Sequence, residues 1–323
     1  MDAPAPSDML TRGDPLACLL DGPRARGAFM IRACFEPPWA VRVEDRAPLT
    51  VMLMARGDAW ITHDGGEQVR LRPGDLAIAR GPAPYTCGDT PTTALQALIL
   101  PGGECRCPDG SSLNGSMDLG VRTWGDRPDA PTVMLIGTYL MQGEISNRLL
   151  DALPPLLTLP AEVWQCPLTP FLMEEVVRDE PGQEVVLDRL LDLLVISALR
   201  AWFSRPEAAA PAWYRALGDP VVGRALRLIQ NDPAHPWTVA ALAARAGVSR
   251  AALARRFTEL VGEPPMAHLT GWRLALAADR LRDTEDTLAA IARRVGYGSA
   301  FALSSAFKRV YGVSPQEHRT RAA

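Results

Sequence analysis

The sequence contains few histidines and almost no lysine. Four histidines occur in 323 residues, and only His63 precedes residue 235. This scarcity limits any multi-histidine metal centre or histidine-based catalytic site in the N-terminal two thirds. Lys308 is the only lysine among 34 basic residues. We attribute that bias to genome composition, so the abundance of arginine alone carries little functional weight.

Long apolar runs and a secretory leader are also missing. No run reaches the ~18–20 residues that a membrane span needs, and residues 1–14 lack the basic and apolar regions of a signal peptide. We therefore expect a cytoplasmic protein with no membrane partner. Six cysteines, all within the first 166 residues, are then expected to stay reduced. No Ser-His-Asp set, Walker loop or dinucleotide glycine motif is found, and we expect neither an enzyme nor a cofactor.

The charge is divided unequally along the chain. With 47% hydrophobic and 22% charged residues, the composition is that of a globular protein, and the length predicts two domains. Residues 219–323 carry 15 Lys and Arg against 9 Asp and Glu, a net charge of +6, whereas residues 1–218 carry a net charge of −9. A basic C-terminal third on an acidic body indicates a polyanionic partner for that third.

The N-terminal half has the alternation of β-strands. Short runs of period two, separated by glycine-containing turns, predict a small antiparallel barrel or sandwich. The runs are 50–54, 59–62, 69–72 and 76–79. We expect a long loop over 101–116 and a further strand over 133–140.

Helical spacing begins after Gly143. A first set (Leu149, Leu153, Leu156, Leu157) predicts the start of a helix, and a second set marks one face of a longer helix. The second set is Leu187, Leu190, Leu191, Leu194, Ala198 and Trp202. That face either packs on the barrel or forms a homodimer seam. Residues 204–212 have the composition of a linker.

An internal repeat is the strongest signal in the sequence. Residues 238–247 and 287–296 both follow the pattern Thr-x-Ala-Ala-apolar-Ala-x-Arg-apolar-Gly, and the segments that follow also match at Phe, Gly and Pro positions. The offset is 49 residues at the start and 50 at the end, which indicates one inserted residue near Gly298.

Each copy of the repeat predicts two helices joined by a tight turn. Thr238 and Thr287 are expected to cap the first helices, and Ser249 and Ser299 the second ones. Glycine at the turn suits a positive φ angle. The apolar faces of the second helices are expected to comprise Leu253, Phe257 and Leu260 in one copy and Leu303, Phe307 and Val310 in the other. This is the helix-turn-helix arrangement, whose second helix enters the DNA major groove.

A long helix over 266–281 is expected to connect the two copies. Leu269, Trp272, Leu276 and Leu281 would face inward from it. Two successive major grooves on one side of DNA lie roughly 34 Å apart. We expect the rigid connector to let one subunit read both grooves. A helical bundle used only for protein contacts is the alternative.

Residues 219–323 resemble the AraC/XylS family of bacterial transcriptional regulators. The resemblance rests on 237–238, 246–250, 256–257, 262–265, 272–273, 296–297, 307–309 and 311–315. Residues 15–205 are similar to the cupin-type sensor of one branch of that family, through Pro38-Trp39, 57–66, 72–75 and 153–157. The resemblance implies a two-domain α+β protein: a cupin-like antiparallel β-barrel with helices over 1–204, a linker over 205–218 and an all-α DNA-binding domain with two helix-turn-helix units over 219–323.

The resemblance also implies partners. They are double-stranded promoter DNA, a small-molecule effector and a second copy bound through the N-terminal domain, with RNA polymerase as a further candidate. The predicted DNA-binding residues are Arg250, Ala251, Ala254, Arg255, Arg256, Ser299, Ala300, Ser304, Ser305 and Lys308. Arg255 is the best base reader, because arginine donates two hydrogen bonds to guanine. Arg250 and Arg256 are assigned to phosphates.

The second recognition helix is poorer in polar side chains. Ala300 and Ser305 stand where similar proteins usually have longer polar residues, and Phe301 and Ser304 occupy the neighbouring exposed positions. Contact with thymine methyl groups, phosphate contacts through Ser304 and Lys308, or readout of DNA shape are the alternatives for this helix.

The N-terminal domain is expected to bind a small organic effector in the barrel. Met52, Met54, Trp60 and Tyr85 are the predicted lining residues. Many cupins hold a metal, but only His63 is available here, and we interpret it as a surface strand residue, with no metal site. A thiol-based redox switch using Cys18, Cys87, Cys105 and Cys107 is the alternative. Without such a switch, Cys18, Cys34 and Cys166 are expected to be small buried apolar residues. A cupin-type enzyme is the third hypothesis.

Overall fold

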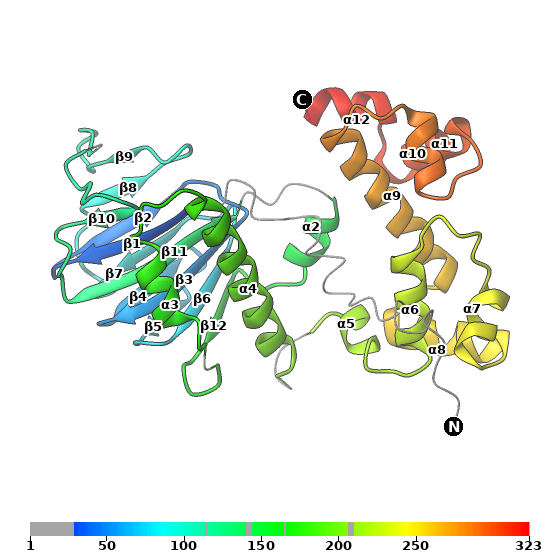
Figure 1. Ribbon diagram of the computed structural model, residues 1–323, viewed down its shortest axis with the longest axis horizontal. Helices are drawn as coiled ribbons and strands as arrows, with labels where there is room; N and C mark the ends of the chain where they lie inside the picture. Colours follow the sequence, from blue (N-terminus) through cyan, green and yellow to red (C-terminus); the bar gives the residue numbers. More distant parts are fainter. Residues whose placement is uncertain (1–28, 114, 140–143, 165, 206–209, 323) are drawn as a thin grey trace. The chain divides into compact units, whose positions relative to one another are not determined.

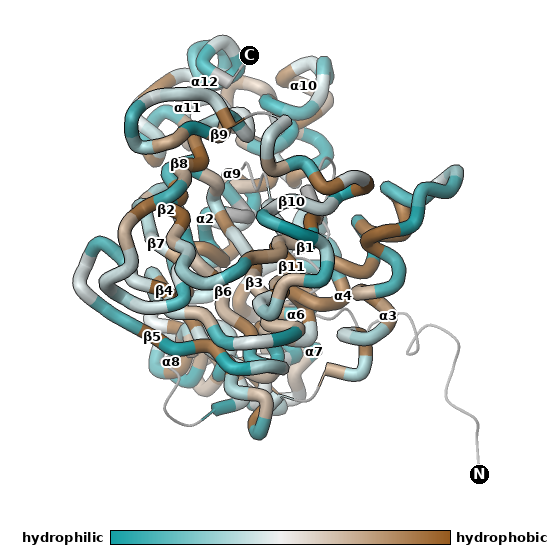
Figure 2. The backbone as a smooth tube through the Cα atoms, turned by 90° about the vertical axis from the view of Figure 1, so that its left-hand side faces the viewer, coloured by the Kyte–Doolittle hydropathy of each residue, from teal (hydrophilic) through white to brown (hydrophobic). Residues whose placement is uncertain are grey.

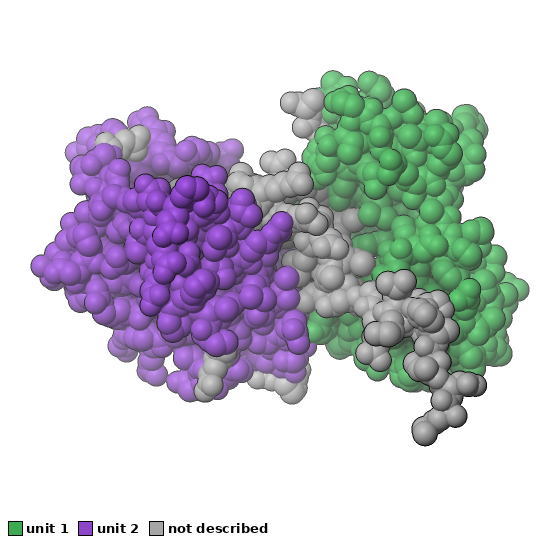
Figure 3. All heavy atoms as spheres, viewed as in Figure 1, with its two compact units in different colours: residues 1–22, 142–149, 209–323 green, residues 23–141, 150–208 purple. Residues whose placement is uncertain are grey.

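The structure is a computed structural model that describes residues 29–113, 115–139, 144–164, 166–205 and 210–322. The chain forms two compact units, shown in two colours in Figure 3. We call residues 23–141 and 150–208 the β unit, and residues 142–149 and 209–323 the helical unit. The predicted domain limits at 204 and 219 stay predictions, although residues 212–216 of the predicted linker form a helix.

Two six-stranded sheets make up the β unit (Figure 1). One has the order β10-β1-β11-β3-β6-β12 and the other the order β5-β4-β7-β2-β8-β9. Most neighbours are antiparallel, and β1 with β10 and β2 with β8 are parallel. The strands are β1 (Phe29–Phe35), β2 (Ala40–Val43), β3 (Leu49–Arg56), β4 (Ala59–His63), β5 (Gln68–Leu71), β6 (Leu76–Arg80), β7 (Tyr85–Gly88), β8 (Ala97–Ile99), β9 (Cys105–Arg106), β10 (Thr123–Gly125), β11 (Thr132–Tyr139) and β12 (Leu156–Leu159).

The four predicted runs of period two are all strands. They became β3, β4, β5 and β6 because their alternate side chains face the space between the sheets. In β4, Ala59, Ile61 and His63 are buried, whereas Trp60 and Thr62 are partly exposed. The main apolar core of the unit lies between the sheets, around residues such as Phe35, Trp39 and Met52.

The turn between β3 and β4 requires glycine. Gly57 has a φ angle of +69°, and a Cβ there would lie 2.7 Å from the Pro131 carbonyl oxygen. Any side chain would therefore be strained and would also collide with the neighbouring backbone. This glycine allows β4 to follow β3 after two residues.

Two predictions for this half were wrong in detail. Leu156 and Leu157 do not continue a helix. They begin β12, which pairs antiparallel with β6 at the edge of a sheet, and Pro154-Pro155 breaks the helix before it. The predicted loop over 101–116 contains the two-residue strand β9.

Helices α3 (Thr169–Glu175) and α4 (Gln183–Phe203) complete the β unit. Figure 2 shows α4 largely in the colours of apolar residues. Leu187, Leu191 and Leu194 are buried, and a Cβ at Gly137 of β11 would lie 2.5 Å from the Leu191 Cδ1 atom. The predicted apolar face of α4 thus packs on the sheet.

The helical unit is built around α9 (Pro265–Asp283), which lies between two groups of helices in Figure 1. One core joins the first half of α9 to the helices before it, and a second core joins its last part to the helices after it. The other helices are α2 (Glu144–Leu150), α5 (Ala212–Ala216), α6 (Val222–Asn231), α7 (Val239–Ala246), α8 (Arg250–Val261), α10 (Leu288–Arg294), α11 (Ala300–Tyr311) and α12 (Pro315–Ala322).

The N-terminal part of α2 lies against α9 within the helical unit. The Glu144 backbone N–H donates to Asp279 Oδ1 at 2.7 Å, and the Arg148 guanidinium lies 6.0 Å from the Trp272 ring. A Cβ at Gly271 would come within 2.8 Å of Arg148 Nη2. The absence of a side chain at Gly271 therefore makes room for the Arg148 guanidinium.

Candidate nucleic-acid interface

The two copies of the repeat fold into matching pairs of helices, α7–α8 and α10–α11. The hydroxyls of Thr238 and Thr287 accept hydrogen bonds from the backbone N–H groups of Ala241 and Ala290 and so cap α7 and α10. The hydroxyls of Ser249 and Ser299 cap α8 and α11 in the same way, from Ala252 and Ala302. All four predicted N-caps are confirmed.

Glycines occupy the turns between the paired helices. Gly247 has a φ angle of +72° and Gly296 one of +83°, the left-handed region that favours glycine. Leu253 and Phe257 of α8, and Leu303 and Phe307 of α11, are fully buried. The predictions for Leu260 and Val310 were wrong, since these residues are 37% and 55% exposed. In each helix the next residue, Val261 or Tyr311, packs against the core instead.

Helix α8 presents arginines on its exposed face. The Arg255 side chain is 77% exposed, and its Nε lies 3.9 Å from the Glu259 carboxylate, one turn further along the helix. Such a pair is weak in water, so the guanidinium is available to a ligand. Arg250 and Ala251 are also exposed and Ala254 is partly buried. Helix α8 therefore presents two exposed cations, Arg250 and Arg255, to an anionic ligand.

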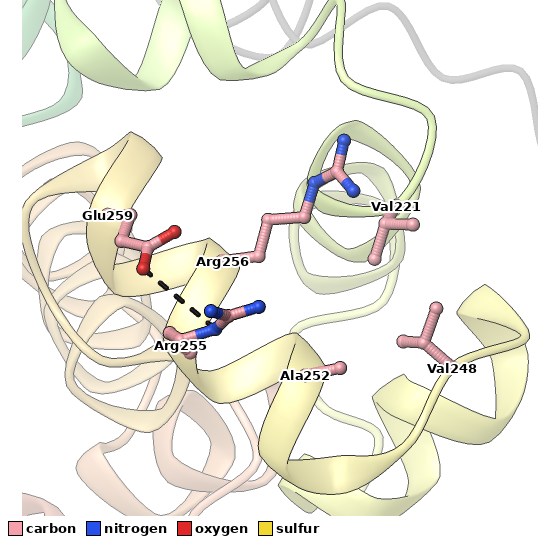
Figure 4. Close-up of a pocket in the computed structure, with 6 residues that line it drawn as sticks. All are labelled: Val221, Val248, Ala252, Arg255, Arg256 and Glu259. Atoms are coloured by element: carbon pink, nitrogen blue, oxygen red, sulfur yellow. Dashed lines mark ion pairs between the residues drawn. The ribbon is translucent and has the colours of Figure 1, made fainter.

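Arg256 has a different role from Arg250 and Arg255. Its Nε and Nη2 donate to Asp219 Oδ2 at 2.9 and 2.5 Å. In Figure 4 its side chain extends towards Val221, away from Arg255. Val221, Arg255 and Arg256 border a pocket of about 220 Å³ together with Val248, Ala252 and Glu259. The assignment of Arg256 to a phosphate stays a prediction, and the ion pair competes with it.

Asp219 was not identified from the sequence. Its side chain accepts hydrogen bonds from the backbone N–H groups of Val221 and Val222 at the start of α6 as well as from Arg256. Burial acts to raise the pKa of Asp219, but these hydrogen bonds outweigh burial and hold the pKa below its usual value. An Asp just before a helix is a recognisable capping signal. The sequence gives no signal, however, that this Asp pairs with Arg256, 37 positions away.

Helix α11 presents a different face. Ser299, Ser305 and Lys308 are exposed, and Ala300 and Ser304 are partly buried. Phe301 has 81% of its surface exposed. Between Ser299 and Lys308 the exposed face thus carries no long polar side chain, and one aromatic ring stands out from it.

In the β unit, three of the four predicted effector-lining residues point into the core. Met52, Met54 and Tyr85 belong to the core between the sheets. Trp60 does not: it lies on the other, partly exposed face of β4. Its assignment to the lining was wrong because the inward residues of β4 are the odd-numbered ones.

His63 is buried, not exposed as expected. Only 9% of its surface is accessible, because it shares the inward face of β4 with Ile61. Its Nδ1 accepts a hydrogen bond from the Gly65 backbone N–H at 3.2 Å, which places the ring proton on Nε2. His63 Nε2 and Trp39 Nε1 are buried and have no hydrogen-bond partner among the described residues. The core therefore contains two polar groups that a bound molecule would satisfy.

The cysteines differ in environment. Cys34 and Cys87 are buried, and Cys105, Cys107 and Cys166 are partly exposed. Burial raises the pKa of the Cys87 thiol to about 12 and also raises that of Cys105. A raised pKa lowers the thiolate fraction and hence the reactivity. Cys18 lies outside the described residues, and the redox assignment of this set stays a prediction.

Among the described residues, no group of three or more His, Cys, Asp or Glu side chains lies together as a metal site would require. None of the helices in this described part of the chain is long and apolar enough to cross a membrane.

Known families match both parts of the chain. Residues 14–204 match the Cupin family and residues 242–321 match the Helix-turn-helix domain family. A putative AraC-like transcription regulator of Streptomyces antibioticus is 34% identical over 95% of this chain and 98% of its own length. The HTH-type transcriptional regulator AlkR of Acinetobacter baylyi is 27% identical over 87% of this chain and 90% of its own length.

Solved structures are similar mainly in the C-terminal third. An AraC-type transcriptional regulator from Chromobacterium violaceum is 27% identical, covers 33% of this chain and 96% of its own, and superposes with a TM-score of 0.32. Both the Streptomyces and the Acinetobacter relative, which match over most of their length, are transcription regulators. With an N-terminal cupin domain and a C-terminal helix-turn-helix domain that binds DNA, the chain belongs to the AraC family of transcriptional regulators.

Proposed function

We propose that this protein is a cytoplasmic bacterial regulator whose DNA binding is controlled by a small organic molecule held between the two sheets of the cupin domain. The observation that carries the proposal is the pair of buried, unpartnered N–H groups at Trp39 and His63 in an otherwise apolar core. A buried polar group without a partner is unfavourable. A ligand with hydrogen-bond acceptors would remove that penalty.

The strand register separates these two groups within the core. His63 is paired with Tyr85 at one end of β7, whereas Trp39 precedes Ala40, which is paired with Gly88 at the other end. Met52 and Cys87 lie between them, with their sulfur atoms 3.7 Å apart. A ligand that reaches both groups is therefore elongated, with a polar atom near each end and an apolar middle.

The experiment is ligand binding by the full-length protein. A library of small organic compounds is screened by the shift in melting temperature, and hits are repeated with His63→Phe and Trp39→Phe. We expect a stabilising compound whose effect is reduced by either substitution. Val69→Ala, on β5 at the margin of the core, serves as the matched control. A compound that stabilises all variants equally binds elsewhere and contradicts the proposal.

We further propose that the regulator acts as a homodimer through its β unit. The buried face of α4 is already packed on β11, so the available surface is its outer face, where Val185 is 61% exposed and Leu193 is 45% exposed. Exposed apolar side chains on one helix favour association. Analytical ultracentrifugation of wild type and Leu193→Asp tests this, and a substitution that leaves the mass in solution unchanged contradicts it. RNA polymerase remains a proposed further partner.

A further inference from the structure

Phe301 is the most exposed large apolar side chain in the described part of the chain. It is 81% exposed, whereas the next, Val185, is 61% exposed. Phe301 is not needed to pack α11, because Leu303, Ala306 and Phe307 are the residues of this helix that fill the core. An aromatic ring held in water on a short helix indicates contact with a partner.

The position of Phe301 places that partner at the start of a recognition helix. Phe301 is the second residue of α11, directly after the turn and the Ser299 cap, and its equivalent in the first copy is Ala251. The N-terminal residues of such helices are those that reach base edges in the major groove. Ser304, Ser305 and Lys308, at spacings of three, four and seven, share its face.

The chemistry of this face favours one feature of DNA. Ser304 and Ser305 are short, and Lys308 lies two turns further along the helix, so Phe301 is the side chain that extends furthest at this end of α11. It cannot donate or accept a conventional hydrogen bond. The apolar group that the major groove displays is the C5 methyl of thymine. The exposed cations Lys308 and Arg309 on the same helix fit a DNA partner better than an apolar protein surface.

We propose that Phe301 selects a thymine by contact with its C5 methyl group. The second helix-turn-helix unit then reads sequence through an apolar contact, while the first reads it through Arg255. This inference rests on DNA binding by the helical unit. It adds a specificity-determining residue that the resemblance did not supply.

The test uses the full-length protein and a duplex selected by it from random DNA. Each thymine of the selected site is replaced in turn by deoxyuridine, which removes only the methyl group. We expect one position, about one helical turn from the guanine read by Arg255, to weaken wild-type binding by about fourfold, the factor for one buried methyl. Phe301→Ala should bind the thymine and uracil duplexes equally, and Phe301→Leu should keep the preference.

Three further measurements keep the outcomes separate. Arg255→Ala should bind more weakly but keep the thymine preference. Val310→Ala, at the other end of α11, should keep both the affinity and the thymine preference. The proposal is overturned if the wild type binds the thymine and uracil duplexes equally at every position. It is also overturned if Phe301→Ala still prefers thymine over uracil. If Phe301→Ala binds DNA like the wild type but loses the transcriptional response, Phe301 contacts a protein, and the thymine proposal is also overturned. Failure to select any duplex would instead refute DNA binding itself.

Discussion

The two helix-turn-helix units share their interior and differ in the surface that they present. Phe257 and Phe307 occupy equivalent places in the two cores, and Ser249 and Ser299 equivalent caps. On the exposed faces, by contrast, Arg255 corresponds to Ser305, and Ala251 to Phe301. The comparison shows that the repeated residues specify how each unit folds, and the varied ones determine the surface that each unit presents.

The largest effects are expected from substitutions in the two cores, which test whether the units fold in the same way. Phe257→Ala and Phe307→Ala each remove a fully buried ring, and we expect a loss of about 3–5 kcal/mol of unfolding free energy in the unit concerned. Because the two cores lie on different parts of α9, hydrogen exchange should accelerate mainly in α8 for the first variant and in α11 for the second. Equal acceleration of both helices by either variant would show that the units do not unfold separately.

On the exposed faces we expect an asymmetric result. Arg255→Ala should weaken binding to the selected duplex by roughly 1–3 kcal/mol and relax the base preference. Lys308→Ala should weaken binding to all sequences and reduce the salt slope by about 1. Both are measured by fluorescence anisotropy over a range of salt concentrations.

Glu259→Gln is the matched control for Arg255. It removes the weak partner of Arg255 and should leave base preference unchanged. If Arg255→Ala lowers specific and nonspecific affinity equally, Arg255 does not read a base.

Local chemistry made much of the helical unit predictable. Thr238 and Ser299 were identified as caps because a hydroxyl, the following helix and the glycine turn lie within ten residues of one another. The alternation in β4 was equally visible, but the sequence did not show which of its two faces is inward. Trp60 was expected inside and His63 at the surface, whereas the structure buries Ile61 and His63.

Contacts between distant segments were not predictable in this way. Leu156 and Leu157 fit a helix or a strand, and the choice was made by the free edge of β6, nearly eighty residues earlier in the chain. The ion pair of Asp219 with Arg256 likewise joins two elements whose separation in the sequence gives no periodic signal. The candidate site was identified because the repeat carries it. The Asp219–Arg256 ion pair, which we call the tether, was missed because only one copy has it.

Removal of the N-cap hydroxyl should lower the free energy of unfolding by about the same amount in both units. Ser249→Ala and Ser299→Ala each remove a hydroxyl that accepts one backbone N–H, and we expect a loss of about 1 kcal/mol for each. Urea denaturation followed by circular dichroism measures the change. Ser249→Asp and Ser299→Asp retain a capping oxygen and should retain the stability. A loss of stability in only one of the two alanine variants would show that the two caps are not energetically equivalent.

The smallest expected effect concerns the tether that only the first unit has. Asp219→Asn keeps an oxygen for the α6 cap but removes the charge that pairs with Arg256, whereas the equivalent of Arg256 in the second unit is the buried Ala306. Because the Arg256 side chain is half exposed, we expect a loss below about 1 kcal/mol. The pKa of Asp219 is lowered in the folded state, so its contribution is complete above the unfolded pKa and disappears as the pH falls through the lower folded pKa. Wild type and Asp219→Asn should therefore differ in stability at neutral pH and converge in acid, and a difference that persists in acid would assign the effect to the cap and not to the charge.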